Sequence, residues 1–432
     1  MNTINHELFQ YIAACPTAYQ AVAHTAALLE AAGYTRLCES AGWILEPGCG
    51  YLVTRNHSSL IAFRLPSSTP SGYMISAAHG DSPCFKVKEA AELRDGHYVR
   101  LSTESYGGML CSSWLDRPLS IAGRAVVRAE NGIETRLVDL REPLAVIPNV
   151  AIHMNRSANE GMSYNAAVDM LPLAGGRDAA PLRSRVAEGI GVREEDILAT
   201  DLFAYNPQPG VEWSGFISAP RLDDLQCAFA SLRAFLASGR SSAESAAVYC
   251  LFDNEEVGSL TKQGACSTFL SDVLERIGCA LGMDRAAQLR ALGGSFIVSC
   301  DNAHAVHPNH PEYMDPNHAV YMNGGVVVKY NANQKYSSDA VSAAVFRLVC
   351  ERAGTPLQRY ANRADMPGGS TLGNIANAHV SVNTVDIGLA QLAMHSAFET
   401  AGAEDTKHMT DAMTAFFGCS LRMSADGSYE LV

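Results

Sequence analysis

Three short apolar runs in this chain each end in histidine or acidic side chains. The runs cover residues 73–78, 246–252 and 295–300, and they are followed by His79 with Asp81, by residues 253–256, and by Asp301 with His304. Apolar runs of this length, bounded by polar residues, predict fully buried strands. Because ligands gather outside the carboxyl ends of strands in open α/β sheets, we expect the three polar groups to meet at one edge.

The surrounding pattern predicts an α/β fold. From about residue 215 onward, strand-like and helix-like segments alternate. The expected helices cover two segments within residues 1–33, then 224–237, 267–277, 338–353 and 403–417, and the expected strands include a hairpin at 50–66 and a strand at 380–385. For the helix at 338–353, Ser338 is the expected N-cap and Gly354 the residue that ends it. Such alternation implies a mixed sheet covered by helices on both faces.

The middle of the chain has a different character. Residues 86–150 alternate apolar and polar side chains between charged turns, and residues 155–195 are rich in Gly, Asn and Arg with weak periodicity. This β-rich segment lies between two α/β segments. We therefore expect a discontinuous α/β domain formed by 1–88 and 216–432, with an inserted β-rich domain at 89–215.

Composition excludes several classes of function. The net charge of −13 disfavours a nucleic-acid or anionic-membrane partner, since both require a basic surface. No apolar stretch approaches the roughly 20 residues that span a bilayer. The first residues lack the features of a secretory signal, and the 12 cysteines contain no CxxC pair. A cytoplasmic protein with free thiols is the expectation.

The polar groups favour metal chemistry when they are taken together. Singly, His79 reads as a surface histidine, Asp223 as a helix N-cap, Asp301 as a turn residue, His395 as a core histidine and the pair Glu255–Glu256 as a solvated loop. Jointly, two histidines and four acids form a ligand set that suits a pair of divalent cations. Adjacent glutamates also allow one to bind a metal while the other orients a water as general base.

At these positions the chain resembles the aspartyl aminopeptidase family, which includes the vacuolar aminopeptidase I type. The matching segments cover nearly the whole chain in the family's order: AAHGDSP (77–83), WLDRPLSIAGR (114–124), IPNVAIHMNR (147–156), APRLDDLQC (219–227), FDNEEVGS (252–259), DNAHAVHPN (301–309), GGVVVKYN (324–331), ADMPGGSTLG (364–373) and VDIGLAQLAMHS (385–396). FDNEEVGS and AHAVHPN are the most specific of them.

The resemblance implies a role for each matching metal-site residue. One metal is expected on His79, Asp223 and Asp301, and the other on Asp223, Glu256 and His395, with Asp223 as the bridge. Glu255 is the expected general base, and Asp81 is expected to orient His79. The resemblance therefore implies two divalent ions per subunit. Zinc is the expected metal, and manganese and cobalt are alternatives because the same ligands accept all three.

The resemblance also implies a substrate and an assembly. The substrate class is a peptide with a free N-terminus and an acidic first residue. Its expected binding residues are Lys329, His304, Asp365, Met366 and Ser370. His153 is expected to reach from the inserted domain into a neighbouring subunit and to stabilise the oxyanion there. The inserted domain is expected to mediate dimerisation within a dodecamer, and the catalytic domain to be zinc-peptidase-like.

Some features leave alternatives open. The chain departs from the family's usual motifs at Gly80, Asp224 and Gly368, and the segment 15–20 lacks the family's terminal histidine. Lys329 is also readable as a solvent-exposed lysine at a strand end. Another two-metal amidohydrolase, such as an N-acyl amino-acid deacylase or a broad aminopeptidase, remains the nearest alternative, and a non-catalytic shell protein is the alternative of a different class.

Overall fold

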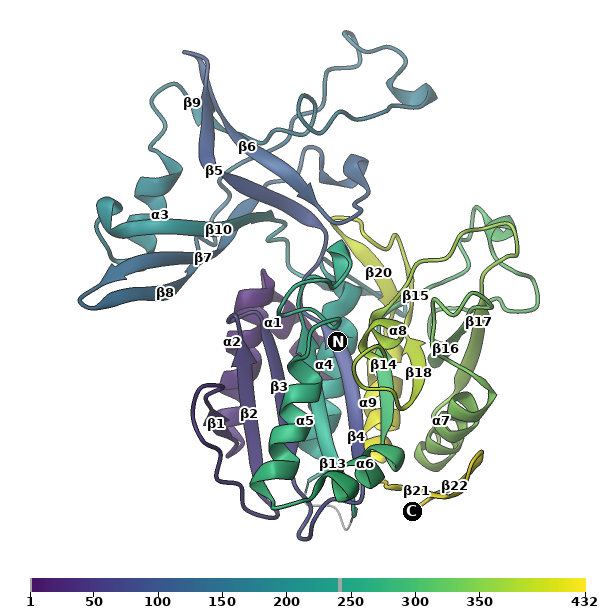
Figure 1. Cartoon of the computed structure of the whole chain (residues 1–432). Helices are drawn as coiled ribbons and strands as arrows, with labels where there is room; N and C mark the ends of the chain where they lie inside the picture. The colour runs from purple at the N-terminus through teal and green to yellow at the C-terminus, as the bar shows by residue number, and fades with distance from the viewer. Residues whose placement is uncertain (1, 240–242) are drawn as a thin grey trace.

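A mixed sheet forms the centre of the molecule in the computed structural model, which describes residues 2–239 and 243–432 (Figure 1). Within these ranges it has nine strands, in the order β1 (Thr35–Leu37), β2 (Gly50–Arg55), β3 (Ser59–Arg64), β13 (Ala246–Phe252), β4 (Tyr73–His79), β14 (Phe296–Cys300), β18 (Asn383–Gly388), β16 (Val326–Tyr330) and β17 (Leu357–Ala361). Strands β13, β4, β14 and β18 run parallel to one another. Their carboxyl ends therefore share one edge, and the mixed α/β class is confirmed.

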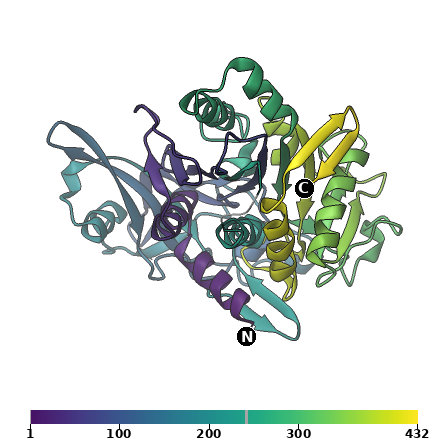
Figure 2. The same cartoon turned by 90° about the horizontal axis from the view of Figure 1, so that it is seen from below.

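Helices cover both faces of this sheet (Figure 2). One layer contains α1 (Thr3–Ala14), α2 (Ala18–Ala31), α4 (Leu222–Ala237), α7 (Ala340–Ala353) and α9 (Asp405–Phe417), and the other contains α5 (Phe269–Ala280), α6 (Arg285–Gly293) and α8 (Leu372–Ala376). Successive residues of β4 serve the two layers, since Met74 packs in the first core and Ile75 in the second. This two-sided burial explains why the strand has no polar face.

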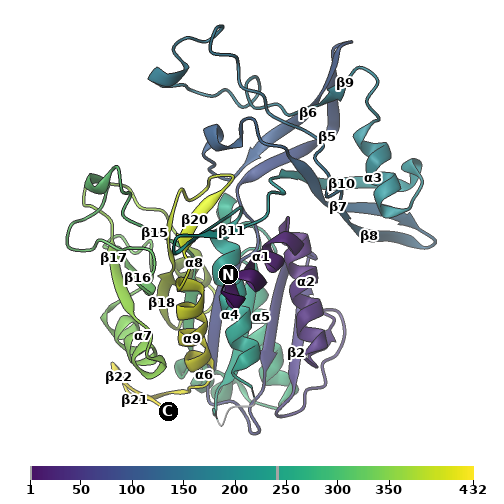
Figure 3. The ribbon, with the colours of Figure 1, turned by 180° about the vertical axis from the view of Figure 1, so that it is seen from behind.

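A second sheet stands beyond the carboxyl edge of the central sheet (Figures 1 and 3). Its order is β8 (Gly132–Asp139), β7 (Ser120–Ala129), β10 (Ile197–Tyr205), β5 (Cys84–Arg94), β6 (Tyr98–Tyr106) and β9 (Leu173–Gly176), with α3 (Leu182–Ile190) beside it. It has its own core, which includes Phe85, Trp114 and Val186. The expected β-rich insertion corresponds to this sheet, although the limits 89–215 stay a prediction.

A small third sheet links the two larger ones. It consists of β11 (Val211–Trp213), β12 (Phe216–Ala219), β20 (Glu399–Gly402), β19 (Ala390–Leu392) and β15 (Ala303–His304). The chain ends in the hairpin β21 (Leu421–Ala425) and β22 (Ser428–Leu431), and the single turns are η1 (Cys111–Trp114), η2 (Ala158–Glu160), η3 (Glu194–Asp196), η4 (Glu255–Val257) and η5 (Pro311–Tyr313). Because β12 precedes Asp223, β20 follows His395 and the two strands pair, this sheet brings the segments that carry Asp223 and His395 together.

One predicted helix cap is wrong. Helix α7 begins after Asp339, whose carboxylate accepts the N–H of Ser342 in a capping box, and not after Ser338. The Ser338 hydroxyl instead accepts the N–H of Asp386, so a tertiary contact uses the group that the prediction assigned to the cap. Gly354 ends the helix in the left-handed region, with φ of 65°, as predicted.

Two properties expected from composition bear on the whole chain. Among the described residues, no helix combines the length and the apolar character that crossing a membrane requires. The cysteines from Cys15 to Cys419 in the described ranges are free thiols.

Candidate active site

The predicted ligands converge at the carboxyl edge of the central sheet. His79 is the last residue of β4, Asp301 directly follows β14, and Glu256 lies in η4 just after β13. Asp223 lies in the first turn of α4, where its φ of −82° and ψ of 109° are not helical, and His395 lies between β19 and β20. The structure thus gathers five side chains from five separate segments.

These side chains form two groups that share one aspartate. His79 Nε2 lies 3.6 Å from Asp223 Oδ1 and 3.9 Å from Asp301 Oδ1. His395 Nε2 lies 3.3 Å from Asp223 Oδ2 and 3.3 Å from Glu256 Oε2. The ligand atoms in each group lie within 4.8 Å of one another. Asp223 therefore presents one carboxylate oxygen to each group, which is the geometry of a bridging ligand.

The donor set fits divalent cations. Asp223 Oδ1 and Glu256 Oε1 are buried and have no hydrogen-bond partner in the described part of the chain, which is costly unless a cation meets them. Ligand atoms about 2.0–2.1 Å from a tetrahedral ion are about 3.3 Å apart, close to the observed separations. Imidazole and carboxylate together suit zinc, manganese or cobalt.

Electrostatics point to the same need for positive charge. Burial lowers the pKa of His395, but the hydrogen bond to Asp223 and the charges of Glu256 and Asp223 outweigh it and raise that pKa to about 10. Burial likewise lowers the pKa of His79, but the neighbouring carboxylates of Asp223, Asp301 and Asp81 outweigh burial and raise that pKa well above its usual value. Without a metal, protons on the imidazoles would balance the carboxylates.

Both histidines are oriented so that Nε2 faces the shared space. His79 Nδ1 lies 3.1 Å from the Asp81 carbonyl oxygen, and His395 Nδ1 lies 2.6 Å from the Gly108 carbonyl oxygen. A carbonyl can only accept, so each Nδ1 carries the hydrogen and each Nε2 keeps its lone pair for a metal.

Asp81 organises more than His79. Its carboxylate lies 3.4 Å from His79 Nδ1 and accepts the N–H groups of Glu255 at 3.3 Å and Glu256 at 3.1 Å. It also accepts the hydroxyl of Tyr106 at 2.8 Å. One carboxylate therefore holds the imidazole of the first group and the backbone of η4. Sequence reasoning missed Tyr106, because a tyrosine at a strand end carries no distinctive signal.

The segment after β6 forms one wall of the site. Gly107 has φ of 76°, and a Cβ atom there would lie 3.0 Å from the Glu256 Cβ, so this close approach favours glycine. The carbonyl of Gly108 orients His395, and the N–H of Leu110 donates to the His395 carbonyl at 3.0 Å. The inserted sheet is thus part of the site of its own chain.

Lys329 is buried beside Asp301. Its ammonium donates to the Asp301 carbonyl at 2.9 Å, to the Asn302 carbonyl at 3.3 Å and to the Asp301 carboxylate at 3.4 Å. The alternative of a solvent-exposed lysine is therefore wrong. At Gly388 on the neighbouring strand a Cβ would lie 2.0 Å from the Asp301 carbonyl oxygen, so no side chain fits there.

Asp224, one of the departures from the family motifs, lies beneath the site. It is fully buried, and its carboxylate accepts the His79 N–H at 3.2 Å. Burial raises its pKa well above the usual value. Neither ligand group includes Asp224. It therefore supports the end of β4 from behind, a contact that sequence reasoning did not anticipate.

Sequence reasoning also missed Glu399. This residue lies four positions after His395, and its side chain is 2% exposed. It accepts backbone N–H groups of two predicted ligands. No motif marked it, because a single glutamate beside a short strand is common.

The remaining residues that were predicted to contact the substrate are more exposed than Lys329. His304 is solvent-accessible beside Tyr360, with ring centres 6.2 Å apart, and desolvation together with the Lys329 charge lowers its pKa. His153 is exposed in the long segment between β8 and β9 of the insertion. Its role in a neighbouring subunit stays a prediction.

Three further predicted residues lie between β17 and α8. Asp365 is exposed and pairs with Arg363 at 2.6 Å, Met366 is 39% exposed, and the Ser370 hydroxyl donates to the Asn374 side chain at 3.1 Å. The Ser370 hydroxyl also donates to the Lys335 carbonyl at 3.5 Å, and neither ligand group includes any of the three residues. Their role in substrate binding also stays a prediction.

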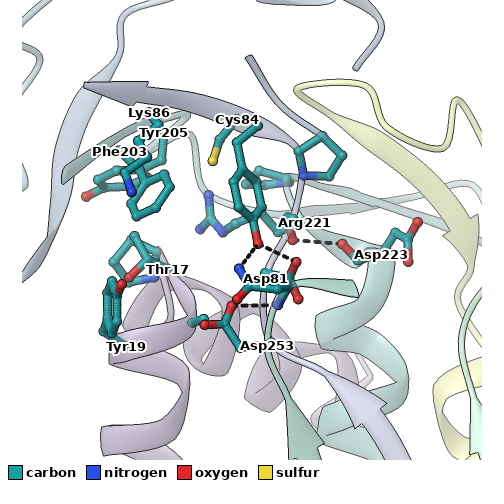
Figure 4. A pocket seen from close by; sticks show the side chains of 18 of the residues that line it. Thr17, Tyr19, Asp81, Cys84, Lys86, Phe203, Tyr205, Arg221, Asp223 and Asp253 are labelled. Atoms are coloured by element: carbon teal, nitrogen blue, oxygen red, sulfur yellow. Dashed lines mark hydrogen bonds between the residues drawn. The ribbon is translucent and has the colours of Figure 1, made fainter. Parts of the chain in front are cut away.

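A cavity of about 300 Å³ borders the site, between the inserted sheet and the N-terminal end of α2 (Figure 4). Asp81 and Asp223 contribute to its wall, together with residues of both signs of charge and several aromatic rings: Tyr19, Lys86, Phe203, Tyr205, Arg221 and Asp253. Burial and the charge of Asp81 raise the pKa of Asp253 to about 7. The mixed lining gives the cavity no clear ligand class.

Known proteins are similar in sequence to this chain over nearly its whole length. The family model described as Aminopeptidase I zinc metalloprotease (M18) matches residues 11–417. A "Probable M18 family aminopeptidase 2" of Clostridium novyi is 41% identical over 414 residues, covering 93% of this chain and 95% of that protein. The protein of the same name in Pseudomonas aeruginosa is 42% identical over 430 residues, covering 96% and 98%.

Solved structures share the fold. The chain matches one in the cryo-EM structure of the Ape4 and Nbr1 complex with a TM-score of 0.93 and 32% identity, covering 96% of this chain and 85% of that one. It matches the S. cerevisiae mApe1 dodecamer structure with a TM-score of 0.83 and 27% identity, covering 96% of each chain.

Proposed function

This chain belongs to the M18 family of zinc metalloaminopeptidases, and on that basis we propose that it removes acidic residues from peptide N-termini with a pair of divalent ions. The observation that carries the proposal is the position of Asp223, whose two oxygens lie 3.6 Å and 3.3 Å from the Nε2 atoms of His79 and His395. The proposed ligands are His79, Asp223 and Asp301 for one ion and Asp223, Glu256 and His395 for the other. Zinc is the proposed metal, in keeping with the family.

When bound, such a pair of ions activates a shared water and polarises the scissile carbonyl. Glu255 is the proposed general base, since its Oε2 lies 4.0 Å from His79 Nε2 and its side chain is 15% exposed. Burial raises its pKa to about 8, with His79 opposing and the nearby aspartates adding to the rise. Cations at the site would lower that pKa toward neutrality, where a base works best. Glu255 would take the water's proton and return it to the leaving amine.

The proposed acidic preference rests on the family resemblance and on Lys329. Burial lowers the pKa of this lysine, but Asp301 and Tyr336 outweigh burial and raise it above its ordinary value, so the ammonium stays charged. A buried cation at the base of the site would attract a carboxylate on the first residue of the substrate. His304, Asp365, Met366 and Ser370 are proposed as the other walls of the substrate pocket.

We also propose that the protein is a homo-oligomer, as in the mApe1 dodecamer structure, with dimers formed through the inserted domain at 89–215. The insertion exposes large apolar side chains, including Ile133 at 68%, Met154 at 84% and Val168 at 67%. These side chains are available for burial against a partner subunit. His153, in the same exposed segment as Met154, would then stabilise the oxyanion in a neighbouring subunit.

A panel of substrates tests the proposal. Aspartyl, glutamyl, alanyl and leucyl p-nitroanilides and N-acetyl-aspartyl p-nitroanilide are assayed before and after chelation, and again after zinc is restored. We expect the aspartyl and glutamyl substrates to be cleaved fastest, the acetylated one to be inert, and chelation to abolish activity reversibly. Preferred cleavage of the acetylated substrate would indicate a deacylase, and equal rates for all free amines would indicate a broad aminopeptidase.

A further inference from the structure

Glu399 lies where two metal-binding segments meet. It is the first residue of β20 and lies opposite Ala219, the last residue of β12, in the antiparallel ladder. The chain leaves β12 and reaches Asp223 four residues later, and His395 lies four residues before Glu399. The small third sheet thus places Glu399 between the shared ligand and the second histidine.

The carboxylate of Glu399 holds the backbone of both ligands. Its Oε2 accepts the Asp223 N–H at 3.0 Å, and its Oε1 accepts the His395 N–H at 2.7 Å. Both backbones are irregular, since Asp223 is not helical and His395 has φ of 66°. Neither N–H therefore belongs to a helix or a strand ladder, and the carboxylate satisfies both.

Stability of the fold alone does not explain why this acceptor is a carboxylate. Glu399 is 2% exposed, and among the described residues none of its hydrogen bonds comes from a Lys or Arg side chain. A neutral amide would avoid the cost of burying a charge but could accept only one of the two N–H groups. The group is better explained by what it aligns.

Resting on the proposed function, we propose that Glu399 is a positioning residue that aligns Asp223 and His395 on the same ion. Its two oxygens fix the two backbones relative to each other, and the side chains then meet at 3.3 Å. Because Asp301 and His79 make no contact with Glu399, its loss should weaken the ion on His395 and Glu256 more than the ion on His79 and Asp301.

Glu399→Gln tests this assignment, with Glu404→Gln as the matched control on an exposed residue five positions further on. The amide keeps the size of the side chain but can accept only one of the two N–H groups. We expect the affinity for one zinc ion, measured by titration against a competing chelator, to fall about 10- to 100-fold, the usual effect of removing such support. Elemental analysis after dialysis should find one ion per chain instead of two.

The thermal unfolding of the metal-free protein separates alignment from stability. We expect metal-free Glu404→Gln to unfold at the wild-type temperature and metal-free Glu399→Gln to unfold only a few degrees below it, because one buried N–H loses its acceptor. Glu399→Asp, which keeps the charge but is one methylene shorter, should lose the same ion. Wild-type ion content and affinity in both Glu399 variants would overturn the proposal, and so would the failure of both variants to fold. Wild-type protein that holds no ion would instead contradict the proposed function.

Discussion

Asp223 shows what single residues contribute to this site. The alternative that it is merely the N-cap of α4 is wrong, because the cap position is Arg221 and no side chain caps that end. Its two oxygens instead face two histidines at 3.6 Å and 3.3 Å. Residue types alone predict that acids and histidines lie together at the site. Which acid lies between the two ligand groups depends on the irregular turn at Asp223, and no local sequence pattern predicts that turn.

Replacing Glu255 by Gln should separate catalysis from metal binding. We expect turnover to fall by about two orders of magnitude or more, because the amide cannot move the proton. Ion content should stay at the wild-type level, since Glu255 is not among the proposed ligands. The measurements are kcat on an aspartyl substrate and elemental analysis, with the exposed Glu275→Gln as control. Near-normal turnover of Glu255→Gln would refute its role as the base.

At the scale of elements, the predicted strands that deliver the ligands are confirmed. The runs that ended in polar groups are β4, β13 and β14, because a strand buried on both faces leaves an unbroken apolar signature. The third sheet was not predicted, since β15 has only 2 residues and β19 only 3, too few to show a period. Helix α3 was hidden in a segment of weak periodicity.

The same limit applies to contacts between elements. The sequence predicts the insertion to be a dimerisation unit, whereas strand β6 supplies Tyr106, and the segment after it supplies Gly108, to the site of the same chain. Glu399 was missed for a related reason, because its value comes from a β12–β20 pairing between residues far apart in sequence. Motif spacing predicts the candidate metal ligands, but it does not predict residues such as Tyr106 and Glu399, whose hydrogen bonds position the site.

Tyr106→Phe should reveal the contribution of the insertion to the site. It removes the hydrogen bond that the hydroxyl donates to the Asp81 carboxylate and the one that it accepts from the Asn254 side chain, and bonds to charged groups contribute about 1.5–3 kcal/mol. We expect kcat/KM to fall about tenfold, while Tyr98→Phe, an exposed tyrosine on the same strand, should have no effect. Equal activity of the two variants would mean that Tyr106 does not position Asp81 for catalysis.

At the scale of the whole molecule, we propose that the exposed segment that carries His153 connects the site to the assembly. His153 belongs to neither ligand group of its own chain. If it serves a neighbouring subunit, each complete site requires two chains. The assembly would then be needed for activity.

Subunit mixing tests this sharing. His153→Ala and Glu255→Gln assemblies should each be nearly inactive. Mixed assemblies, refolded or co-expressed, should regain part of the activity, because some sites combine Glu255 of one chain with His153 of another. Light scattering checks that mixed and single assemblies have the same mass. Activity that remains the sum of the separate variants would place His153 outside the neighbouring site.

Anomalous diffraction from zinc-loaded crystals would show whether Asp223 bridges two ions, as we propose. We expect two anomalous peaks per chain, about 3.5–4 Å apart, one on each side of the Asp223 carboxylate. One peak should lie against His79 and Asp301, and the other against Glu256 and His395. A single peak, or two peaks of which only one contacts Asp223, would contradict the account.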